Sequence, residues 1–225
     1  MRVSTGCKAL DALLKGGVEN GAITEFYGEA GSGKTTVCIQ IAREVAASGK
    51  RVIYIDTEGI SPERLHQVCG EEAAKRMLFF EPYDFDEQEG DVEKAAKLAL
   101  GNSDVGLVVL DTATMHYRVD MRREMERSER KSLSTQITHL LRVARKRGIP
   151  VVVTSQVYTD IGTDEFKPLG GHVLHHNAKA IVKLEKLKGA RRRAVLMKHR
   201  ALPEGGSAEF FLTDMGIEDC REHEG

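Results

Sequence analysis

Residues 28–35 read Gly-Glu-Ala-Gly-Ser-Gly-Lys-Thr, and this segment constrains the fold more than any other part of the chain. Four residues separate Gly28 from Gly33-Lys34-Thr35, the spacing of a loop whose glycines let successive N–H groups point at one phosphate. The apolar run Ile23–Tyr27 precedes the loop and the amphipathic stretch Thr36–Ser48 follows it, which predicts a buried strand and a helix on its two sides. We therefore predict a strand–loop–helix unit that binds a phosphate at the N-terminus of the helix.

We expect the same loop to supply most of the contacts to a nucleotide. Lys34 is long enough to reach the β- and γ-phosphates, and the hydroxyl of Thr35 suits a ligand position on Mg²⁺. The nucleotide-binding residues expected in this segment are Gly28, Glu29, Ala30, Gly31, Ser32, Gly33, Lys34, Thr35 and Thr36.

Short apolar runs alternate with helical patterns along the first two thirds of the chain. Helices are expected at Pro62–Cys69 and Val92–Leu100, and a third contains Ile137, Leu140, Leu141 and Ala144 on one face. Several strands are apolar at consecutive positions, as in a parallel sheet covered by helices on both faces. The predicted strands are Ile23–Tyr27, Val52–Asp56, Met77–Phe80, Gly106–Asp111 and Pro150–Ser155.

The C-terminal third has a different pattern. Ala180–Leu187 and Arg192–Lys198 alternate on either side of Gly189, which predicts an antiparallel hairpin, and Glu209–Thr213 predicts one more strand. Two segments, about 115–131 and 157–172, fit no regular element, and we expect them to be functional loops.

The composition is that of one folded α/β domain, since 41% of the 225 residues are hydrophobic and 30% are charged. The four cysteines share no metal-type spacing and are expected to be reduced thiols. The sequence shows no signal peptide and no apolar run approaching the roughly 18 residues of a membrane span. We therefore expect a cytoplasmic protein that does not enter a membrane.

The charges are strongly segregated along the chain. Between Asp56 and Glu93 there are 12 acidic and 3 basic residues, a net charge of −9. Between Lys183 and Arg200 there are 8 basic residues and 1 acidic residue, a net charge of +7. The basic stretch is either a solvated face that pairs with nearby acids or the electrostatic footprint of nucleic-acid binding.

Polar side chains follow three of the predicted strands. Asp111 ends an apolar strand, where an acid can steady Mg²⁺ through water or through Thr35. Glu58 and Gln156 follow two other strands, and open α/β sheets place their ligands at this edge. A carboxylate there can activate water, and a glutamine there can hydrogen-bond a γ-phosphate or its attacking water.

A series of short segments then matches one known family in its order along nearly the whole chain. These segments are Ser4-Thr5-Gly6, Leu10-Asp11, Leu13-Leu14, Gly16-Gly17, Ile23-Thr24-Glu25, residues 28–35, Asp56-Thr57-Glu58-Gly59, Pro62-Glu63-Arg64, Val153-Thr154-Ser155-Gln156-Val157, Pro168, Gly170-Gly171-His172 and Leu202-Pro203-Glu204. On these segments the sequence resembles the RecA/RadA recombinase family, and most closely a short archaeal paralogue within it.

The resemblance implies a single RecA-like P-loop ATPase core over residues 1–225, with no separate N-terminal DNA-binding domain. This core is an α/β fold with a mostly parallel twisted sheet, flanking helices and a C-terminal antiparallel hairpin. The resemblance also implies that Glu58 is the catalytic carboxylate, that Gln156 senses the γ-phosphate and that Arg64 stacks on adenine.

The same resemblance implies a set of DNA-binding residues. The segment that begins at Tyr117 is similar to the family's first DNA-binding loop, and Val157–Leu169 is similar to the second. His176 matches a histidine that links the second loop to the nucleotide. The first loop has a net charge of only +2, so that helical ion pairs are an alternative. Its basic residues are Arg118, Arg122, Arg123, Arg127, Arg130 and Lys131.

The sequence also departs from the family pattern. The second loop is shorter than in strand-exchanging relatives, and Lys198-His199-Arg200 replaces an acid-Ser-Pro run that faces a neighbouring subunit's nucleotide. Two interpretations of this replacement stay open: a phosphate contact across a subunit interface, or a DNA-backbone contact that extends the basic hairpin.

The expected function is an accessory protein of homologous recombination and DNA repair that binds ATP, Mg²⁺ and DNA. We expect slow ATP hydrolysis, no strand exchange and largely sequence-independent binding to single-stranded or branched DNA. The expected protein partners are a recombinase paralogue, a junction nuclease and a second copy of the chain in a weak homo-oligomer.

One alternative is a signalling ATPase or kinase of the clock-protein type, although that type carries paired glutamates where Thr57 precedes a single Glu58. Another is an adaptor that binds nucleotide without hydrolysis and is recognised by a recombinase or nuclease.

Overall fold

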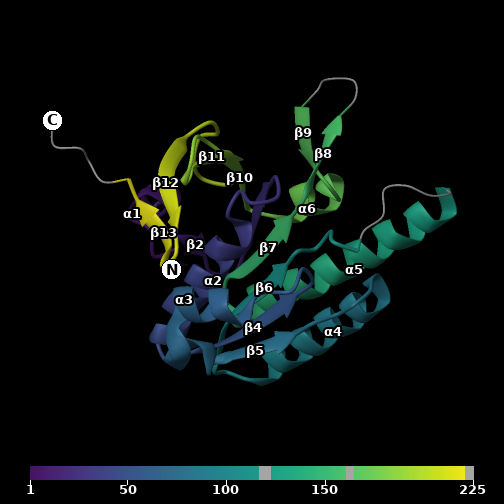
Figure 1. The fold of residues 1–225 in the computed structure, drawn as a ribbon. Coiled ribbons are helices and arrows are strands. Elements are labelled where there is room, and N and C mark those ends of the chain that lie inside the picture. The colour runs from purple at the N-terminus through teal and green to yellow at the C-terminus, as the bar shows by residue number, and fades with distance from the viewer. Residues whose placement is uncertain (117–122, 161–164, 221–225) are drawn as a thin grey trace, which may run out of the picture.

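A nine-stranded sheet runs through the centre of the structure, a computed structural model that describes residues 1–116, 123–160 and 165–220 (Figure 1). Side chains are described for residues 1–116, 129–158 and 169–220. In their order across the sheet, the strands are β13 (Gly216–Asp219), β12 (Ser207–Thr213), β11 (Arg191–His199), β10 (Ala180–Lys186), β3 (Ile23–Gly28), β7 (Val151–Ser155), β6 (Val105–Asp111), β4 (Arg51–Asp56) and β5 (Met77–Phe80).

The pairing of neighbouring strands changes from antiparallel to parallel at β10. From β10 to β5 every neighbouring pair is parallel, whereas the pairs that join β10, β11, β12 and β13 are antiparallel. Strands β3, β4, β6 and β7 are among those predicted from consecutive apolar residues, because both of their faces are covered. The predicted fold class, a mostly parallel sheet with a C-terminal antiparallel extension, is confirmed.

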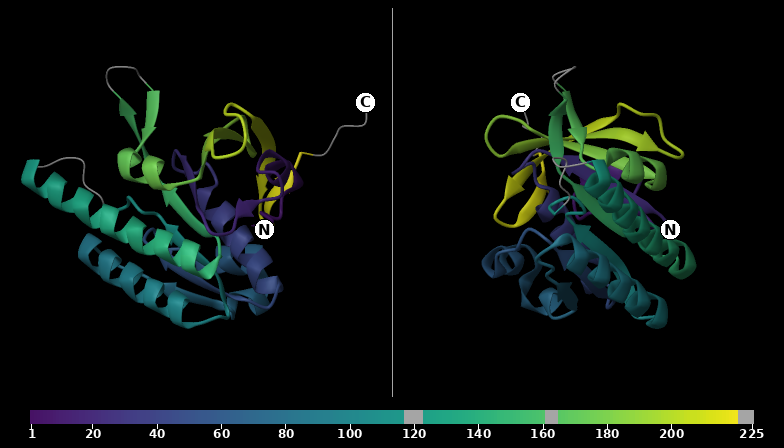
Figure 2. Two further views of the ribbon diagram at one scale, coloured as in Figure 1. Left: turned by 180° about the vertical axis from the view of Figure 1, so that it is seen from behind. Right: turned by 90° about the vertical axis from the view of Figure 1, so that its right-hand side faces the viewer.

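Helices cover both faces of the sheet. Val109 and Val108 are neighbours on β6, yet the first packs with α1, α2 and α3 and the second with α4 and α5. Figure 2 shows α4 and α5 side by side on one face. Among the described residues, no helix has the length and apolarity that crossing a bilayer requires. The helices are α1 (Lys8–Leu13), α2 (Lys34–Ala47), α3 (Pro62–Ala74), α4 (Phe85–Gly101), α5 (Arg123–Arg147) and α6 (Gly171–Asn177).

Both segments that were expected to be irregular contain regular structure. Helix α5 already begins at Arg123, and the four-residue spacing of Glu126 and Arg130 in the sequence is one that supports an exposed helix. Strands β8 (Val157–Asp160) and β9 (Glu165–Pro168) form a two-stranded antiparallel hairpin, which α6 follows. A further short pair, β1 (Arg2–Val3) and β2 (Val18–Glu19), lies near the N-terminus.

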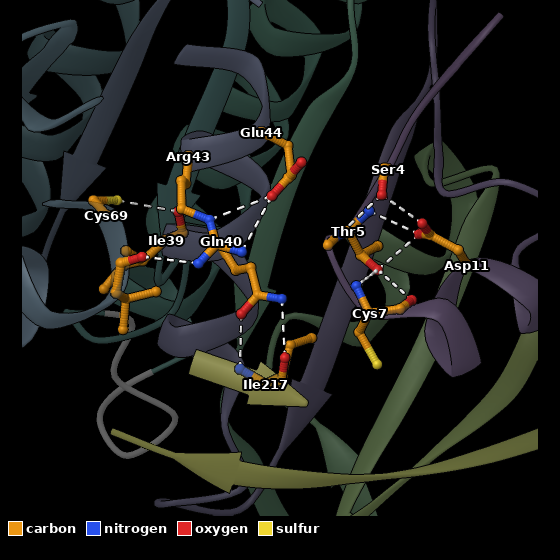
Figure 3. Close-up of polar contacts among 12 residues, drawn as sticks. Ser4, Thr5, Cys7, Asp11, Ile39, Gln40, Arg43, Glu44, Cys69 and Ile217 are labelled. Carbon is orange, nitrogen blue, oxygen red and sulfur yellow. Dashed lines mark hydrogen bonds and ion pairs between the residues drawn. The ribbon is translucent and has the colours of Figure 1, made fainter. Parts of the chain in front are cut away.

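The last strand is attached to the body of the protein by side chains. The Gln40 amide on α2 donates to the carbonyl of Ile217 (3.0 Å) and accepts from its N–H (2.7 Å), as a neighbouring strand would (Figure 3). Figure 3 also shows the Asp11 carboxylate on α1, which accepts hydrogen bonds from Ser4 and Thr5. Asp219 of β13 accepts from the first N–H groups of α1, so the two ends of the described chain lie together.

Candidate nucleotide-binding site

The predicted phosphate loop connects β3 to the N-terminus of α2. Its first glycine permits a close approach, because a Cβ atom on Gly28 would lie 2.3 Å from the carbonyl oxygen of Leu184. Gly33 has a φ of 101°, a conformation that favours glycine, and α2 begins at the next residue. The N-terminus of a 14-residue helix therefore faces the space enclosed by the loop.

Lys34 lies inside this loop. Its Nζ atom donates to the carbonyl oxygens of Gly28 (2.9 Å) and Glu29 (3.1 Å). Burial lowers the pKa of Lys34, while the carboxylates of Glu58 and Asp111 act in the opposite direction. The Ser32 hydroxyl is buried and has no hydrogen-bond partner among the described residues. A cradle that presents a buried cation and an unpaired hydroxyl fits a phosphate group.

Asp111 stands at the end of β6 beside the loop. One of its oxygens accepts from the Thr154 hydroxyl (2.5 Å) and the other from the Tyr54 hydroxyl (2.8 Å). Burial raises the pKa of Asp111, and hydrogen bonds from Thr154, Tyr54 and Thr35 oppose that rise. The contact with Thr35 joins the two residues that were predicted to act on Mg²⁺.

The geometry fits that role for Thr35 and Asp111. Among the residues with described side chains, no group of three or more His, Cys, Asp and Glu could hold a metal ion. A Mg²⁺ held by one hydroxyl, water and phosphate oxygens needs no such group.

Glu58 and Gln156 meet across the mouth of the same site. The Gln156 Nε2 atom donates to Glu58 Oε1 at 2.9 Å, although they follow different strands, β7 and β4. Gln156 is also fixed through its backbone N–H, which donates to the Thr114 hydroxyl at 3.0 Å. The structure thus brings together the two residues predicted to act on water and on the γ-phosphate.

Asp56, which was predicted only as the end of a strand, positions this turn. Its carboxylate accepts hydrogen bonds from the backbone N–H groups of Glu58 (3.2 Å), Gly59 (3.0 Å) and Ile60 (2.6 Å). An aspartate that binds the backbone two or more residues later is the signal of an Asx turn. That signal is present in the sequence Asp56-Thr57-Glu58-Gly59.

A cavity of about 500 Å³ connects these elements. It lies at the carboxyl ends of β3, β4 and β7, where parallel sheets place their ligands. Its lining residues are Gly28, Ala30, Gly31, Gly33, Lys34, Thr35, Thr36, Glu58, Met115, Gln156, Val157 and Leu212. Met115, Val157 and Leu212 were not predicted, because no polar chemistry marks them in the sequence.

Arg64 lies on the side of this site where α2 meets the C-terminal strands. Its guanidinium donates to Thr36 Oγ1 (3.3 Å) and to the carbonyl oxygens of Thr213 (2.9 Å) and Asp214 (2.8 Å). Thr36 lines the cavity, so the predicted adenine-stacking residue lies next to it.

Some of the predicted DNA-binding residues lie outside the described part of the chain, and others line a cavity between two helices. Arg118 and Arg122 lie outside the described residues, and for Arg123 and Arg127 only the backbone in α5 is described. Arg130, Lys131 and His176 line a second cavity, of about 810 Å³, between α5 and α6. Its other described lining residues include no carboxylate and are Ser134, Thr135, Thr138, His139, His172, Val173 and Asn177.

Lys198, His199 and Arg200 make contacts within the chain. The Lys198 ammonium donates to the carbonyl of His175 near the C-terminus of α6. Arg200 forms an ion pair with Glu19. The buried His199 accepts a hydrogen bond from the N–H of Ala201 through Nδ1 (3.0 Å). None of the three is among the described residues that line the nucleotide cavity of their own chain, so both interpretations of this segment stay open.

The position of the predicted phosphate loop after β3, and the antiparallel strands that follow β10, define a RecA-like core. The chain belongs to the Rad51 family, because the family model described as Rad51 matches residues 1–220. It is 45% identical to "DNA repair and recombination protein RadB" of Methanococcoides burtonii over 217 residues, which cover 95% of this chain and 96% of that protein. It is 46% identical to the protein of the same description from Methanoculleus marisnigri over 220 residues, 96% and 97% of the two chains.

A solved structure agrees with these sequences. The structure described as "Crystal structure of the RadB recombinase" is 42% identical and superposes with a TM-score of 0.84, covering 97% of this chain and 100% of that one. The predicted resemblance to the archaeal paralogue, which is RadB, is therefore confirmed.

Proposed function

We propose that this chain is an accessory protein of homologous recombination and DNA repair that binds ATP and DNA and hydrolyses ATP slowly. The observation that carries the proposal is the contact between Glu58 and Gln156 above the phosphate loop. The descriptions of its relatives name DNA repair and recombination, which supports the cellular role.

In the proposed reaction, the loop and Lys34 bind the triphosphate, and Glu58 orients the attacking water and accepts its proton. Gln156 senses the γ-phosphate in this scheme. Its side chain donates a hydrogen bond to Glu58, and the next residue, Val157, begins β8. Because a carboxylate can accept several hydrogen bonds, the contact from Gln156 leaves Glu58 acceptor positions for the attacking water.

Thr35 and Asp111 are the residues that would hold Mg²⁺. When bound there, the ion neutralises charge on the phosphates. Asp111 keeps its orientation through the hydroxyl groups of Thr154 and Tyr54. The side chain of Asp111 is thus held in place by residues of β4 and β7.

The cavity between α5 and α6 is the proposed DNA contact. Its described lining offers cationic, imidazole, amide and hydroxyl side chains, which are groups that bind phosphates, and includes no carboxylate. Such contacts recognise the backbone, so DNA binding is expected to be insensitive to sequence and sensitive to salt.

The test of the ATPase proposal uses two substitutions with different expected effects. Lys34→Ala should abolish ATP binding, because the loop loses the positive charge that binds the triphosphate. Glu58→Gln should preserve ATP affinity and lower turnover by about a hundredfold or more, because the general base is lost. Binding of a fluorescent ATP analogue and release of inorganic phosphate measure the two effects. Turnover that survives both substitutions would show that this site is not the source of activity.

A further inference from the structure

Lys186 of β10 and Arg192 of β11 lie directly opposite each other at the end of the hairpin that these two strands form. Strand β10 pairs with β3 as far as Leu184, which is opposite Gly28, and then continues beside the phosphate loop. Because side chains alternate along a strand, Lys186 is on the same face as Leu184, which packs in the core with α2. Both cations therefore lie on the face of the sheet that carries the phosphate loop and α2.

Arg192 is hydrogen-bonded to the phosphate loop. Its Nε atom donates to the carbonyl oxygen of Gly31 at 3.1 Å, and its Nη1 atom donates to two carbonyl oxygens in the turn of its own hairpin, at 2.9 and 2.8 Å. The N–H of Ser32 donates to the carbonyl oxygen of Glu29 at 3.1 Å. Hydrogen bonds thus hold both sides of the peptide group between Gly31 and Ser32.

The ammonium group of Lys186 lies beside the same loop residue. Its Cε and Nζ atoms are 3.5 and 3.7 Å from the position of a Cβ atom on Gly31. The charge of Lys186 also acts on Lys34 inside the loop, where it adds to the larger effect of burial in lowering the pKa of Lys34. An ammonium group on β10 thus raises the positive potential at the phosphate loop.

The basic residues on the two faces of this hairpin have different partners. Those on the opposite face pair with the carboxylates of Glu185 and Glu209, and they are Lys183, Arg191 and Arg193. Among the residues with described side chains, no carboxylate forms an ion pair with Lys186 or Arg192. Like charges directly opposite each other in a sheet are destabilising, and an anion beside both groups would offset this repulsion.

We propose that Lys186 and Arg192 form a second cationic wall of the phosphate site, supplied by the β10–β11 hairpin of the same chain. Lys186 binds the phosphate chain of a nucleoside triphosphate, and Arg192 is a positioning residue that holds the peptide group after Gly31. The ligand class is a chain of linked phosphates, whose negative charge exceeds the charge of one ammonium group. This inference rests on the proposed nucleotide function and adds to it two residues that are distant from the loop in the sequence.

The first test measures the affinities of ATP and of inorganic tripolyphosphate, each with Mg²⁺, for the full chain by calorimetry. Lys186→Ala should weaken the binding of both ligands by about tenfold, because a contact between an ammonium group and a phosphate is lost. Lys186→Arg retains the charge and should bind both ligands within about twofold of the unchanged chain. Lys188→Ala is the matched control. It removes the same charge from an exposed position between β10 and β11, and it should leave both affinities unchanged.

The second test concerns the positioning residue. Arg192→Ala should also weaken the binding of ATP and tripolyphosphate, because the carbonyl group of Gly31 loses its donor. In steady-state hydrolysis, the KM for ATP should rise while kcat stays within about twofold, since Glu58 and Gln156 are unchanged. Arg191→Ala is the control, because it removes the same charge from the other face of β11 and should leave both affinities unchanged.

These tests have outcomes that would overturn the inference. Unchanged affinities in Lys186→Ala or in Arg192→Ala would remove that residue from the site, and a loss for ATP alone would contradict a contact with phosphate. An equal loss in Lys188→Ala would show that only the total charge of the hairpin matters. The Lys186 variants provide the test if Arg192→Ala does not fold. If the unchanged chain bound neither ligand, the proposed nucleotide site itself would be wrong.

Discussion

At the scale of single residues, Glu25 shows how the sheet beside the phosphate loop carries a buried acid. It lies in β3 with a side chain that is almost fully inaccessible, and it accepts a hydrogen bond from the Ser155 hydroxyl at 2.7 Å. Its other oxygen has no hydrogen-bond partner among the described residues. Burial raises the pKa of Glu25 to about 7, although Ser155 and the charge of Lys198 oppose this rise.

The raised pKa gives the stability of the protein a pH dependence with a definite sign. Between about pH 4.5 and pH 7 the folded chain holds a proton on Glu25 that the unfolded chain has lost, so stability falls as the pH rises. Glu25→Gln should remove this dependence and raise the free energy of unfolding above pH 7 by up to about 3 kcal/mol.

Urea denaturation across this pH range measures the effect. Glu63→Gln, on the exposed surface of α3, is the control and should leave the pH profile unchanged. A Glu25→Gln profile parallel to that of the unchanged chain would contradict the predicted protonation.

At the scale of elements, α5 and α6 together form the cavity that we assign to DNA. Helix α5 begins inside the segment that was predicted as the first DNA-binding loop, and α6 follows the segment Val157–Leu169 that was predicted as the second. Lys131 on α5 and His176 on α6 both line the cavity. The elements therefore place these predicted residues on ordered helices rather than in loops, which lowers the entropy lost on binding.

Lys131→Ala should weaken DNA binding by a similar factor for every sequence. Loss of one phosphate contact should lower the slope of log affinity against log salt by about 1. Fluorescence anisotropy with single-stranded and branched DNA over a salt series measures this slope. Lys94→Ala, on the exposed face of α4, removes the same charge away from the cavity and should leave the slope unchanged. If the slope of log affinity against log salt were unchanged in Lys131→Ala, the proposal that DNA binds at this cavity would be wrong.

The elements also show what the sequence could predict. Strands β3, β4, β6 and β7 were predictable because each carries consecutive apolar residues that are buried on both faces of the sheet. Asp111, Glu58 and Gln156 were predictable in turn, because each ends or follows such a strand. All three lie beside the phosphate loop because parallel strands end at the same edge.

The contacts between distant parts of the chain were not predictable. Asp111 binds Tyr54 and Thr154, which requires β6 to lie between β4 and β7. Strand β13 was missed because only four residues form it and because its attachment depends on Gln40, far away in the sequence.

At the scale of the whole molecule, the segregated charges of the sequence lie in opposite halves of the sheet. The acidic segment Asp56–Glu93 forms α3, β5 and part of α4 near one edge, whereas the basic strands β10 and β11 lie toward the other (Figure 1). Glu209 pairs with Arg191 and Arg193, which neutralises part of the basic charge. Lys186 and Lys188 are exposed, and Lys186 lies beside the phosphate loop.

This distribution predicts head-to-tail self-association that depends on salt. The average mass in sedimentation equilibrium should rise with protein concentration at low salt and stay constant well above about 0.1 M, where charges separated by more than about 10 Å are screened. Replacing Lys186 and Lys188 with Ala should reduce the association at low salt. Association that persists unchanged in high salt would show that apolar contacts hold the copies together.

The attachment of β13 to α1 and α2 has a consequence for how the protein is made. A ribosome delivers the phosphate loop long before residues 216–219, so Gln40 and the N–H groups of α1 emerge without their partners. Contacts between such distant parts of the chain also form slowly. A nascent chain thus carries the phosphate loop for most of its synthesis, but the strand that pairs with Gln40 is among the last parts to be translated.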